Sequence, residues 1–403
     1  MKGREIGKRT MSKYIEEYAK EPRNSIVINE SEINIVEGHK KIVSFLKLNF
    51  WKAFFIEVFL PRGYPHSVSN DYINYQIWDT VQAFASSMTS ALATEAVLRG
   101  AGVGDQNASA LAATLTWLIR DGLGMVSRIV FAWLQSAQLD ADCKRWRLAA
   151  DFLNDFAFSL ELLAAAFPDQ FTLLVCLSSL MRSIVGVAGG ATRTTVVQHQ
   201  ARCNNVADVS AKDGSQETLV NVTALVCSLI LLPLVSGRTI LVWIFYMLFT
   251  GVHLYANYSA VMALHFETLN QKLLEIVTKH FVETGDVCSL NKGNELEPLL
   301  RGCALRHYGC RLSKAIMCKL SATSDFFVVA YEPKFGKAYV AMASGAVQRE
   351  QIKAAFYVEY AIITGRFPSS KEAELFLECL RMKGWRVDVH RLAFDQWTYT
   401  SKD

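Results

Sequence analysis

The chain has 403 residues, of which 51% are hydrophobic and only 20% are charged, and its formal net charge is +4. Because globular domains are about 25% charged, this composition and the mean hydropathy of +0.17 favour a membrane protein with length for two or three domains. The small net charge, without a block of Lys or Arg, excludes a nucleic-acid-binding class, and nine scattered cysteines without a CxxC pair argue against a secreted disulfide framework.

Residues 1–70 are expected to form a mixed cytosolic segment. The alternating run from Ser25 to Ile35 predicts a strand, and the apolar residues between Lys41 and Phe59 predict a helix. The first twenty residues lack an apolar core and contain three glutamates, so they resemble neither a secretory signal nor a typical transit peptide. Membrane insertion would therefore depend on internal helices.

Residues 71–270 are dominated by helix signals. Weaker apolar segments occupy Ile77 to Leu98, Ala108 to Ile119, Met125 to Leu134, Leu148 to Phe167 and Phe171 to Ala188. The strongest are the uncharged runs Thr218 to Val235 and Thr239 to Ala256, which approach the roughly 20 residues needed to cross a bilayer. We predict that these two runs form a membrane hairpin within a polytopic bundle of five to seven helices.

Charged residues interrupt the weaker segments, at Arg120, Asp121, Arg128, Asp151, Asp155, Glu161 and Arg182. Two explanations are open. Either the helices enclose a polar interior, as in a transporter, or they form a soluble helical core with only Thr218 to Ala256 in the membrane. We favour the polar bundle, because segments rich in Ala, Gly, Ser and Thr, such as residues 86–104, suit close helix packing in lipid.

A polar, glycine-rich signature from Gly186 to Glu217 directly precedes the strongest apolar runs. It supplies six candidates for binding an anion or relaying protons, since charge beside membrane helices is expensive and usually functional: Arg193, His199, Asn205, Asp208, Lys212 and Asp213. If the segment is helical, Asn205, Asp208 and Lys212 share one face. The competing interpretations are a surface salt bridge between Asp208 and Lys212, a structural hydrogen bond from His199, and glycines that serve helix packing.

Arg120 and Asp121 are the second group of candidates. They precede two glycines and are expected in a turn between two helices, a weak analogue of the hinge motif of major-facilitator transporters; the alternative is a solvated pair in that turn. The KRWR sequence at Lys144 to Arg147 is expected to mark the cytoplasmic end of a helix, with Trp146 at the membrane interface.

Beyond residue 270 the sequence becomes typical of a soluble domain. Residues 271–296 are predicted to be a linker, and residues 297–403 a small cytosolic α+β domain. Its predicted strands are Phe326 to Tyr331, Ala338 to Ala343 and Arg386 to Phe394, and its predicted helices are Arg349 to Ile362 and Lys371 to Gly384. Ser369 or Ser370 is expected to cap the second helix together with Glu372 or Glu374, and Gly384 to end it.

No metal or cofactor is expected. The tightest group of soft ligands comprises Cys303, His307, Cys310 and Cys318, whose spacing fits no common zinc site. The GAGVGD sequence from Gly100 follows a helix rather than a strand, so it predicts an inter-helix turn and not a dinucleotide loop.

Four long motifs resemble the root UV-B sensitive (RUS) family. They are LPRGYPHSVSNDYINYQIWDTVQA from Leu60, GAGVGDQNASALAATLTWLIRDGLGM from Gly100, LDADCKRWRLAADFLNDFAFSLEL from Leu139 and LYANYSAVMALHFETLN from Leu254. The resemblance implies a membrane-associated protein without an established reaction. Plant members are linked to root UV-B responses, early seedling growth and vitamin B6 homeostasis, but the mixed charge of this N-terminus argues against a plastid location.

The leading hypothesis is a non-enzymatic membrane protein that binds or moves a small polar, anionic metabolite, and whose partners are the bilayer and a second copy or another family member. The alternative is a membrane-anchored adaptor that recruits partners through its C-terminal domain. A third hypothesis is an enzyme in which Lys212 forms a Schiff base with pyridoxal phosphate, but no βαβ scaffold surrounds this lysine.

Overall fold

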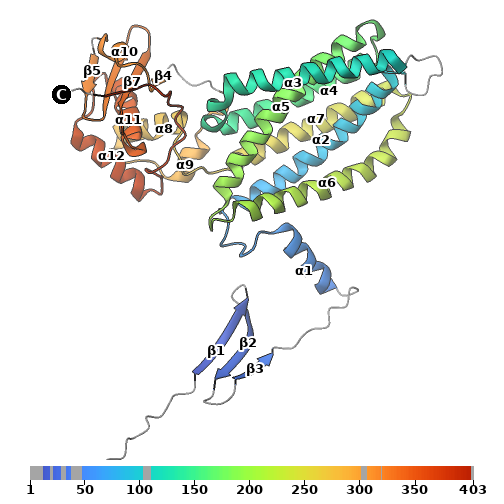
Figure 1. Cartoon of the computed structure of the whole chain (residues 1–403), viewed down its shortest axis with the longest axis horizontal. Coiled ribbons are helices and arrows are strands. Elements are labelled where there is room, and N and C mark those ends of the chain that lie inside the picture. The colour runs from blue at the N-terminus through green and yellow to red at the C-terminus, as the bar shows by residue number, and fades with distance from the viewer. Residues whose placement is uncertain are drawn as a thin grey trace, which may run out of the picture.

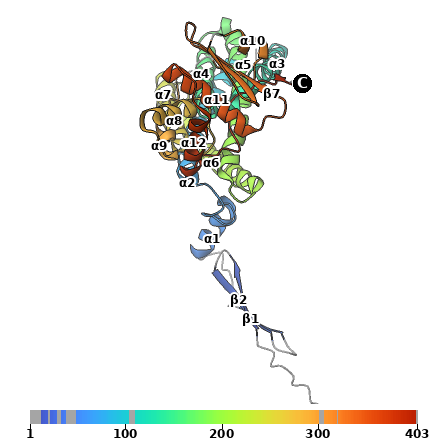
Figure 2. The same ribbon diagram turned by 90° about the vertical axis from the view of Figure 1, so that its left-hand side faces the viewer.

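The computed structural model describes residues 12–18, 21–28, 33–37, 48–102, 110–300, 306–318 and 320–400. These residues are mostly helical and form a small N-terminal sheet, a bundle of long helices and a C-terminal α+β region at one end of the bundle (Figures 1 and 2). The mostly α class expected from the sequence is therefore confirmed.

The N-terminal sheet contains β1 (Ser12–Tyr18), β2 (Glu21–Ile28) and β3 (Ile33–Glu37), which pair antiparallel in the order β1-β2-β3. The run predicted as a single strand thus contributes to two strands. Helix α1 (Leu48–Phe59) follows, within the range predicted for a helix.

Six long helices form the bundle: α2 (Tyr72–Gly100), α3 (Ala110–Ala141), α4 (Cys143–Ala164), α5 (Phe171–Gln200, after the 3-10 turn η1, Pro168–Gln170), α6 (Val206–Val235) and α7 (Thr239–Ala263). Helix α2 lies at the centre and packs along α7, α6 and α4, whereas α5 packs along α3 and α4 (Figure 1). Ala85 and Ala93 of α2 and Ala256 and Ala260 of α7 are fully buried. Small side chains of this kind allow two helix backbones to approach closely.

The two strongest apolar runs lie in α6 and α7, but these helices pack mainly against α2 and touch each other little. The predicted hairpin is therefore two consecutive helices separated by a third. Three described segments are long and apolar enough to cross a membrane, namely Pro168–Gln200, Val206–Val235 and Thr239–Ala263. Large apolar side chains such as Ile129, Trp133, Leu229 and Ile240 cover much of the outer surface of the bundle.

The turn predicted at Arg120 and Asp121 is wrong, because α3 continues through both residues as one helix. One of the two glycines, Gly124, instead packs against α5. A Cβ at Gly124 would lie 2.7 Å from Ser183 Oγ, so a larger residue would require Ser183 to move, whereas Gly122 is exposed with no described atom within 4 Å of such a Cβ. Ser179 Oγ of α5 also donates a hydrogen bond to the carbonyl of Arg120, at 3.0 Å.

The C-terminal region contains a five-stranded sheet made of β4 (Arg306–Tyr308), β5 (Leu320–Thr323), β6 (Phe327–Glu332), β7 (Lys337–Ala343) and β8 (Thr398–Tyr399). The strand order is β4-β7-β6-β5, with β8 also paired to β7. The helices are α8 (Gln271–Thr284), α9 (Leu290–Glu295), α10 (Leu312–Ile316), α11 (Gln348–Thr364) and α12 (Ser370–Met382). The strands predicted at β6 and β7 and both predicted helices are thus present.

Strand β6 is buried on both faces, which explains its uninterrupted apolar sequence. Phe327 and Val329 belong to the main core, which is formed with α8, α11 and α12, whereas Val328 and Ala330 pack with Ala315 of α10. In the main core, the rings of Phe356 and Phe376 stack with centroids 4.0 Å apart.

The linker predicted at residues 271–296 is instead structured. Helix α8 places Leu273, Leu274 and Val277, all fully buried, in the main core of the C-terminal region. An amphipathic helix looks like a polar connection in sequence because half of its surface faces solvent.

The strand predicted at residues 386–394 is also wrong. Its backbone N–H groups at Arg386 and Arg391 donate to carbonyls of Glu267 and Leu269, in the connection that follows α7, so no ladder forms. The capping box between Ser369 and Glu372 is confirmed.

Candidate functional site

Helix α2 carries a polar face along most of its length. Its members recur every three or four residues, the spacing that aligns side chains on one side of a helix: Gln76, Asp79, Gln82, Ser86, Ser90 and Thr94. Helix α4 presents a matching polar face with Arg147, Asp151, Asn154 and Asp155. Contacts between the two helices join these faces inside the bundle.

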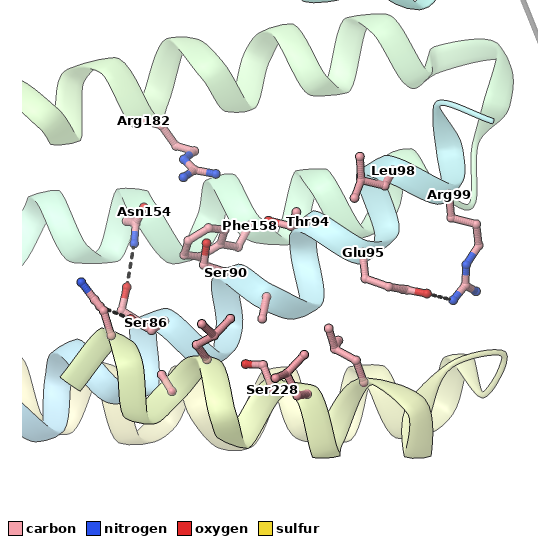
Figure 3. Close-up of a pocket in the computed structure, with 17 residues that line it drawn as sticks. Ser86, Ser90, Thr94, Glu95, Leu98, Arg99, Asn154, Phe158, Arg182 and Ser228 are labelled. Atoms are coloured by element: carbon pink, nitrogen blue, oxygen red, sulfur yellow. Dashed lines mark hydrogen bonds and ion pairs between the residues drawn. The ribbon is translucent and has the colours of Figure 1, made fainter. Parts of the chain in front are cut away.

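The far half of this α2 face borders a cavity of about 820 Å³ between α2, α4, α5 and α6, which we call the bundle cavity. Figure 3 shows Ser86 of α2 next to Asn154 of α4, Ser90 and Thr94 further along α2, and Arg182 of α5 across the opening. Asn154 Nδ2 donates to Ser86 Oγ at 3.3 Å. The cavity therefore offers hydroxyl and amide groups, together with the charged side chains of Glu95, Arg99 and Arg182, in a wall whose other members are mostly apolar. Small-molecule sites commonly combine apolar walls with a few polar groups.

Arg182, one of the charged residues that line the bundle cavity, forms an ion pair with Glu161. Arg182 Nη1 lies 3.2 Å from Glu161 Oε1, and its guanidinium also lies over the Phe158 ring, 4.9 Å from the centroid. Glu161 also accepts a hydrogen bond from Ser178 Oγ at 2.7 Å. The guanidinium remains about one-third exposed, so its free N–H groups can reach a ligand.

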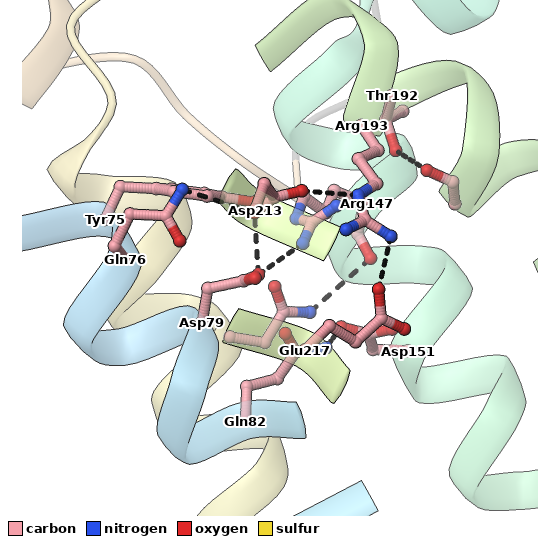
Figure 4. Close-up of polar contacts among 12 residues, drawn as sticks. Tyr75, Gln76, Asp79, Gln82, Arg147, Asp151, Thr192, Arg193, Asp213 and Glu217 are labelled. Carbon is pink, nitrogen blue, oxygen red and sulfur yellow. Dashed lines mark hydrogen bonds and ion pairs between the residues drawn. The ribbon is translucent and has the colours of Figure 1, made fainter. Parts of the chain in front are cut away.

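The near half of the α2 face contains an ion pair between Asp79 and Arg147 of α4 (Figure 4). Tyr75 Oη donates to Asp79 Oδ1 at 3.1 Å, and the Arg147 guanidinium lies 5.5 Å from the centroid of the Tyr75 ring. Both charges are mostly buried. A buried pair of this kind persists only with further hydrogen bonds and ring contacts, which Tyr75 provides.

A second polar group lies one to two turns further along α4. His253 of α7 is 1% exposed, and its Nδ1 lies 2.7 Å from Asp155 Oδ2. Its Nε2 lies 3.3 Å from Gln82 Nε2 and 3.9 Å from Asp151 Oδ2, and Gln82 also donates to Asp151. Imidazole between two carboxylates is an arrangement that can hold and pass a proton.

A third group joins α5 and α6 to α2. Arg193 Nε donates to Asp213 Oδ2 at 2.6 Å, and Gln76 Nε2 donates to Asp213 Oδ1 at 3.2 Å. Arg193 Nη1 also donates to Glu217 Oε2 at 2.5 Å. We use the term polar seam for these three groups: Gln76, Asp79, Gln82, Arg147, Asp151, Asp155, Arg193, Asp213 and His253.

Two of the six candidates in the glycine-rich signature, Arg193 and Asp213, belong to the polar seam. Asp208 and Lys212 share another face of α6, as predicted for a helix, but each has a separate partner. Asp208 Oδ2 accepts from the backbone N–H of Arg62 at 2.7 Å, and Lys212 Nζ donates to the carbonyl of Glu57 at 2.5 Å. Lys212 therefore holds the end of α1 against α6, and Asp208 holds the segment that follows α1.

His199 and Asn205 lie at helix ends. His199 is buried at the end of α5, where its Nε2 lies 2.8 Å from Asp71 Oδ2 and its ring packs edge-on against Phe266. Asp71 also accepts from the backbone N–H of His265 at 2.8 Å, so His199 helps to connect three chain segments. Asn205 precedes α6 and accepts from the backbone N–H of Cys203 at 3.1 Å.

Arg120 lies in α3 with its guanidinium 4.6 Å from the centroid of the Trp117 ring. It borders a small pocket of about 200 Å³ with Arg128 and Arg182, whereas Asp121 is exposed one position further along α3. The glycines of α5 do not serve helix packing, because a Cβ at Gly186, Gly189 or Gly190 would have no described atom within 4 Å.

Seven members of the polar seam are not among the site residues predicted from the sequence: Gln76, Asp79, Gln82, Arg147, Asp151, Asp155 and His253. The sequence signal that could have identified them is a charged residue within an apolar helix. This signal marks Asp151 and Asp155, but it does not show which residues contact them. The KRWR sequence was interpreted as a helix end at the membrane surface. In the structure Arg147 is inside the bundle, and Lys144 is 3% exposed and 3.0 Å from Glu297 Oε2.

A comparison with known proteins identifies the family. A family model described as "Vitamin B6 photo-protection and homoeostasis domain" matches residues 47–285. The chain belongs to the root UV-B sensitive family. The match spans α1 to α8 and therefore contains the bundle cavity and the whole polar seam.

Two curated relatives of this RUS chain illustrate the relationship. It is 44% identical to RUS family member 1 of Dictyostelium discoideum over 248 residues, which are 60% of this chain and 47% of that protein. It is 40% identical to Protein root UVB sensitive 3 of Arabidopsis thaliana over 245 residues, which are 61% of this chain and 56% of that protein. This RUS chain thus spans about half the length of these relatives. No solved structure matches it.

Within the described residues, no three His, Cys, Asp or Glu side chains gather as a candidate metal site. Cys303, one member of the Cys/His group considered in the sequence, lies outside the described residues of the RUS chain.

Proposed function

We propose that this RUS-family chain is an integral membrane protein that binds a small polar, anionic metabolite in the bundle cavity and moves it along the polar seam. The observation that carries the proposal is the position of the seam. Charged and hydrogen-bonding side chains of five helices meet inside a bundle whose exterior is apolar.

The membrane part of the proposal is supported by three apolar segments of at least 25 residues and by the apolar side chains that remain exposed on α3, α6 and α7. A surface of this kind is stable in lipid and a liability in water. Ionisable residues inside membrane helices are rare and usually mark substrate or proton pathways.

The ligand class is supported by the size and chemistry of the bundle cavity. Its volume of about 820 Å³ lies within the range of small-molecule sites. Arg182 supplies a cation, and Ser90 and Asn154 supply neutral hydrogen-bonding groups. The description of the matching family model makes vitamin B6 compounds the natural first substrates to test.

The proton-relay part concerns His253, Asp151 and Asp155. One oxygen of Asp155, Oδ1, is buried without a hydrogen-bond partner among the described residues. A carboxyl group with a free buried oxygen is more readily protonated than a fully paired one. Uptake driven by a proton gradient would use this group.

The membrane assignment is tested by extraction of the full chain from cell membranes with alkaline carbonate. We expect the chain to remain in the pellet and to enter solution only with detergent. Release of the full chain by carbonate alone would refute membrane integration.

Transport is tested in proteoliposomes with labelled pyridoxal 5′-phosphate and pyridoxine. We expect saturable uptake, and a loss of at least about tenfold in Arg147→Met, which leaves Asp79 buried without its cation. The matched control is Arg145→Met, since Arg145 lies on the same helix but is 45% exposed, against 12% for Arg147.

A second variant separates a functional loss from misfolding. Ser90→Leu fills part of the bundle cavity without changing charge, so we expect uptake to fall while the melting temperature stays near that of the wild type. Normal uptake in Ser90→Leu and Arg147→Met would refute the transport pathway. The adaptor hypothesis would be favoured by two results together. Liposomes that contain the wild-type protein would show no uptake, and both Ser90→Leu and Arg147→Met would restore function in cells that lack the protein.

A further inference from the structure

A second cavity, of about 470 Å³, lies at the junction between the bundle and the C-terminal region. We call it the junction cavity. It is separate from the bundle cavity, and its lining comes from the end of α3, the end of α5, the connection after α7 and the segment that follows α12. The lining residues include Asp140, Thr195, Arg202, Glu267, Thr268, Arg386, His390, Arg391, Leu392 and Phe394.

Two of the three arginines that line the junction cavity are paired. Arg202 Nη2 lies 2.8 Å from Glu267 Oε1, and Arg386 Nη2 lies 2.6 Å from Asp388 Oδ2. These pairs are partly exposed and therefore contribute little to stability. The third arginine, Arg391, differs from these two because it forms no ion pair within the described residues.

Arg391 has no carboxylate within ion-pair distance in the described part of the chain. Its guanidinium lies over the Phe266 ring, 3.9 Å from the centroid, and its Nη1 is buried without a hydrogen-bond partner. The nearby carboxylate of Glu297 already pairs with Lys144 at 3.0 Å. Burial lowers the pKa of Arg391, but an arginine stays charged at physiological pH. Arg391 as a whole is half-buried, and a guanidinium nitrogen that is buried without an acceptor is costly. An anion at the half-buried guanidinium would offset this cost.

The neighbouring groups comprise an unsatisfied hydroxyl, two carboxylates, Asp140 and Glu267, and a histidine. The Thr268 hydroxyl is also buried without a partner among the described residues, so the lining of this cavity contains a second unsatisfied donor. Asp140 accepts from Thr195 Oγ1 at 2.6 Å. His390 is bonded through Nε2 to Gln351 Oε1 at 2.6 Å, and burial lowers its pKa to about 4, so it is neutral and adds no competing charge.

We propose that the junction cavity binds a small organic anion, a phosphate monoester or a carboxylate, whose charged group lies against Arg391 and Thr268 and whose apolar part contacts Leu392 and Phe394. Hydrogen bonds between a guanidinium and a carboxylate or phosphate are charge-assisted and are about twice as strong as those between neutral groups. Because the lining joins the bundle to the C-terminal region, a bound anion also connects these two parts.

The test uses the full chain in phosphatidylcholine nanodiscs and measures binding of phenyl phosphate and benzoate by calorimetry, with phenol as the uncharged analogue. We expect saturable binding of at least one anion and none of phenol. Arg391→Gln should weaken the anion at least tenfold. The matched control is Arg311→Gln, because Arg311 also lies over an aromatic ring, that of Trp397 at 4.2 Å, but is outside the cavity. Arg311→Gln should bind within twofold of the wild type.

Two further arms keep the result interpretable. Thr268→Val removes the hydroxyl with little change in volume, and it should weaken the same anion about threefold even if Arg391→Gln folds poorly. Nanodiscs that contain phosphatidic acid distinguish the source of the anion: a rise in melting temperature that Arg391→Gln abolishes would assign the anionic group to a lipid rather than to a soluble metabolite.

Equal anion binding by the wild type and Arg391→Gln would overturn the proposal, as would the absence of both anion binding and any effect of phosphatidic acid. Neither outcome bears on uptake through the bundle cavity, because Arg391 and Thr268 lie outside its lining.

Discussion

Helix α8 contributes to the C-terminal core, although the sequence predicts that the C-terminal domain begins only at residue 297. This difference yields a testable prediction. A fragment of residues 297–403 should not fold, whereas residues 267–403, which include α8 and α9, should. The main-core residues that the shorter fragment lacks include Leu269, Leu273, Leu274 and Val277, which are fully buried, and Phe281, which is 6% exposed.

The expected loss of stability can be estimated from the burial of these side chains. Each such side chain contributes about 1.5–3 kcal/mol when fully buried, so their loss removes roughly 8–15 kcal/mol. The whole free energy of unfolding of a domain is about 5–15 kcal/mol. Deletion of α8 therefore removes as much stability as the region is expected to have, and it also exposes the rings of Phe356 and Phe376.

The assay is circular dichroism with thermal unfolding of both fragments at equal concentration. We expect a cooperative transition for residues 267–403 and no transition for residues 297–403. Leu273→Ala in the longer fragment gives an internal scale, because truncation of a buried leucine costs about 2–5 kcal/mol. A cooperative transition of the shorter fragment at a similar temperature would refute the assignment of α8 to this core.

Three further predictions concern packing, capping and pH. Gly124→Val should lower the melting temperature of the full chain, because its side chain would meet Ser183, whereas Gly186→Ala should be neutral or stabilise by up to about 1 kcal/mol; equal effects of the two would contradict this reasoning. In residues 267–403, Ser369→Ala should lower the free energy of unfolding by about 1 kcal/mol in a denaturant titration, through loss of the capping box; an unchanged midpoint would argue against it. Burial raises the pKa of Asp71, but bonds from His199 and the His265 N–H outweigh it and lower the pKa from 3.8 to about 2. This carboxylate thus contributes about 2 kcal/mol above pH 4 that is lost as the pH falls toward 2, so the stability difference between wild type and Asp71→Asn should shrink over that window; a constant difference would exclude this role.

Helices and strands whose signal lies in a short stretch of residues can be predicted from the sequence alone. Uncharged apolar runs identify α6 and α7, the uninterrupted apolar hexad identifies β6, and the capping residues identify the start of α12. Long motifs also identified the family, and two of them contain Asp79, Arg147, Asp151 and Asp155. In each case the information lies within one helix, strand or motif.

Contacts between side chains of different helices could not be predicted from the sequence and are known only from the folded structure. Asp79 pairs with Arg147, and Asp155 with His253, across 68 and 98 positions of the chain. A helical period shows which residues share a face, but the partner of that face depends on the rotation and axial offset of each helix, which are set by packing throughout the bundle. For the same reason, Gly124, expected in a turn that ends a helix, packs against α5 from inside α3, and a segment expected to be a linker contributes to a core. Local periodicity specifies the surface of each helix, and the surface it contacts is a property of the whole fold.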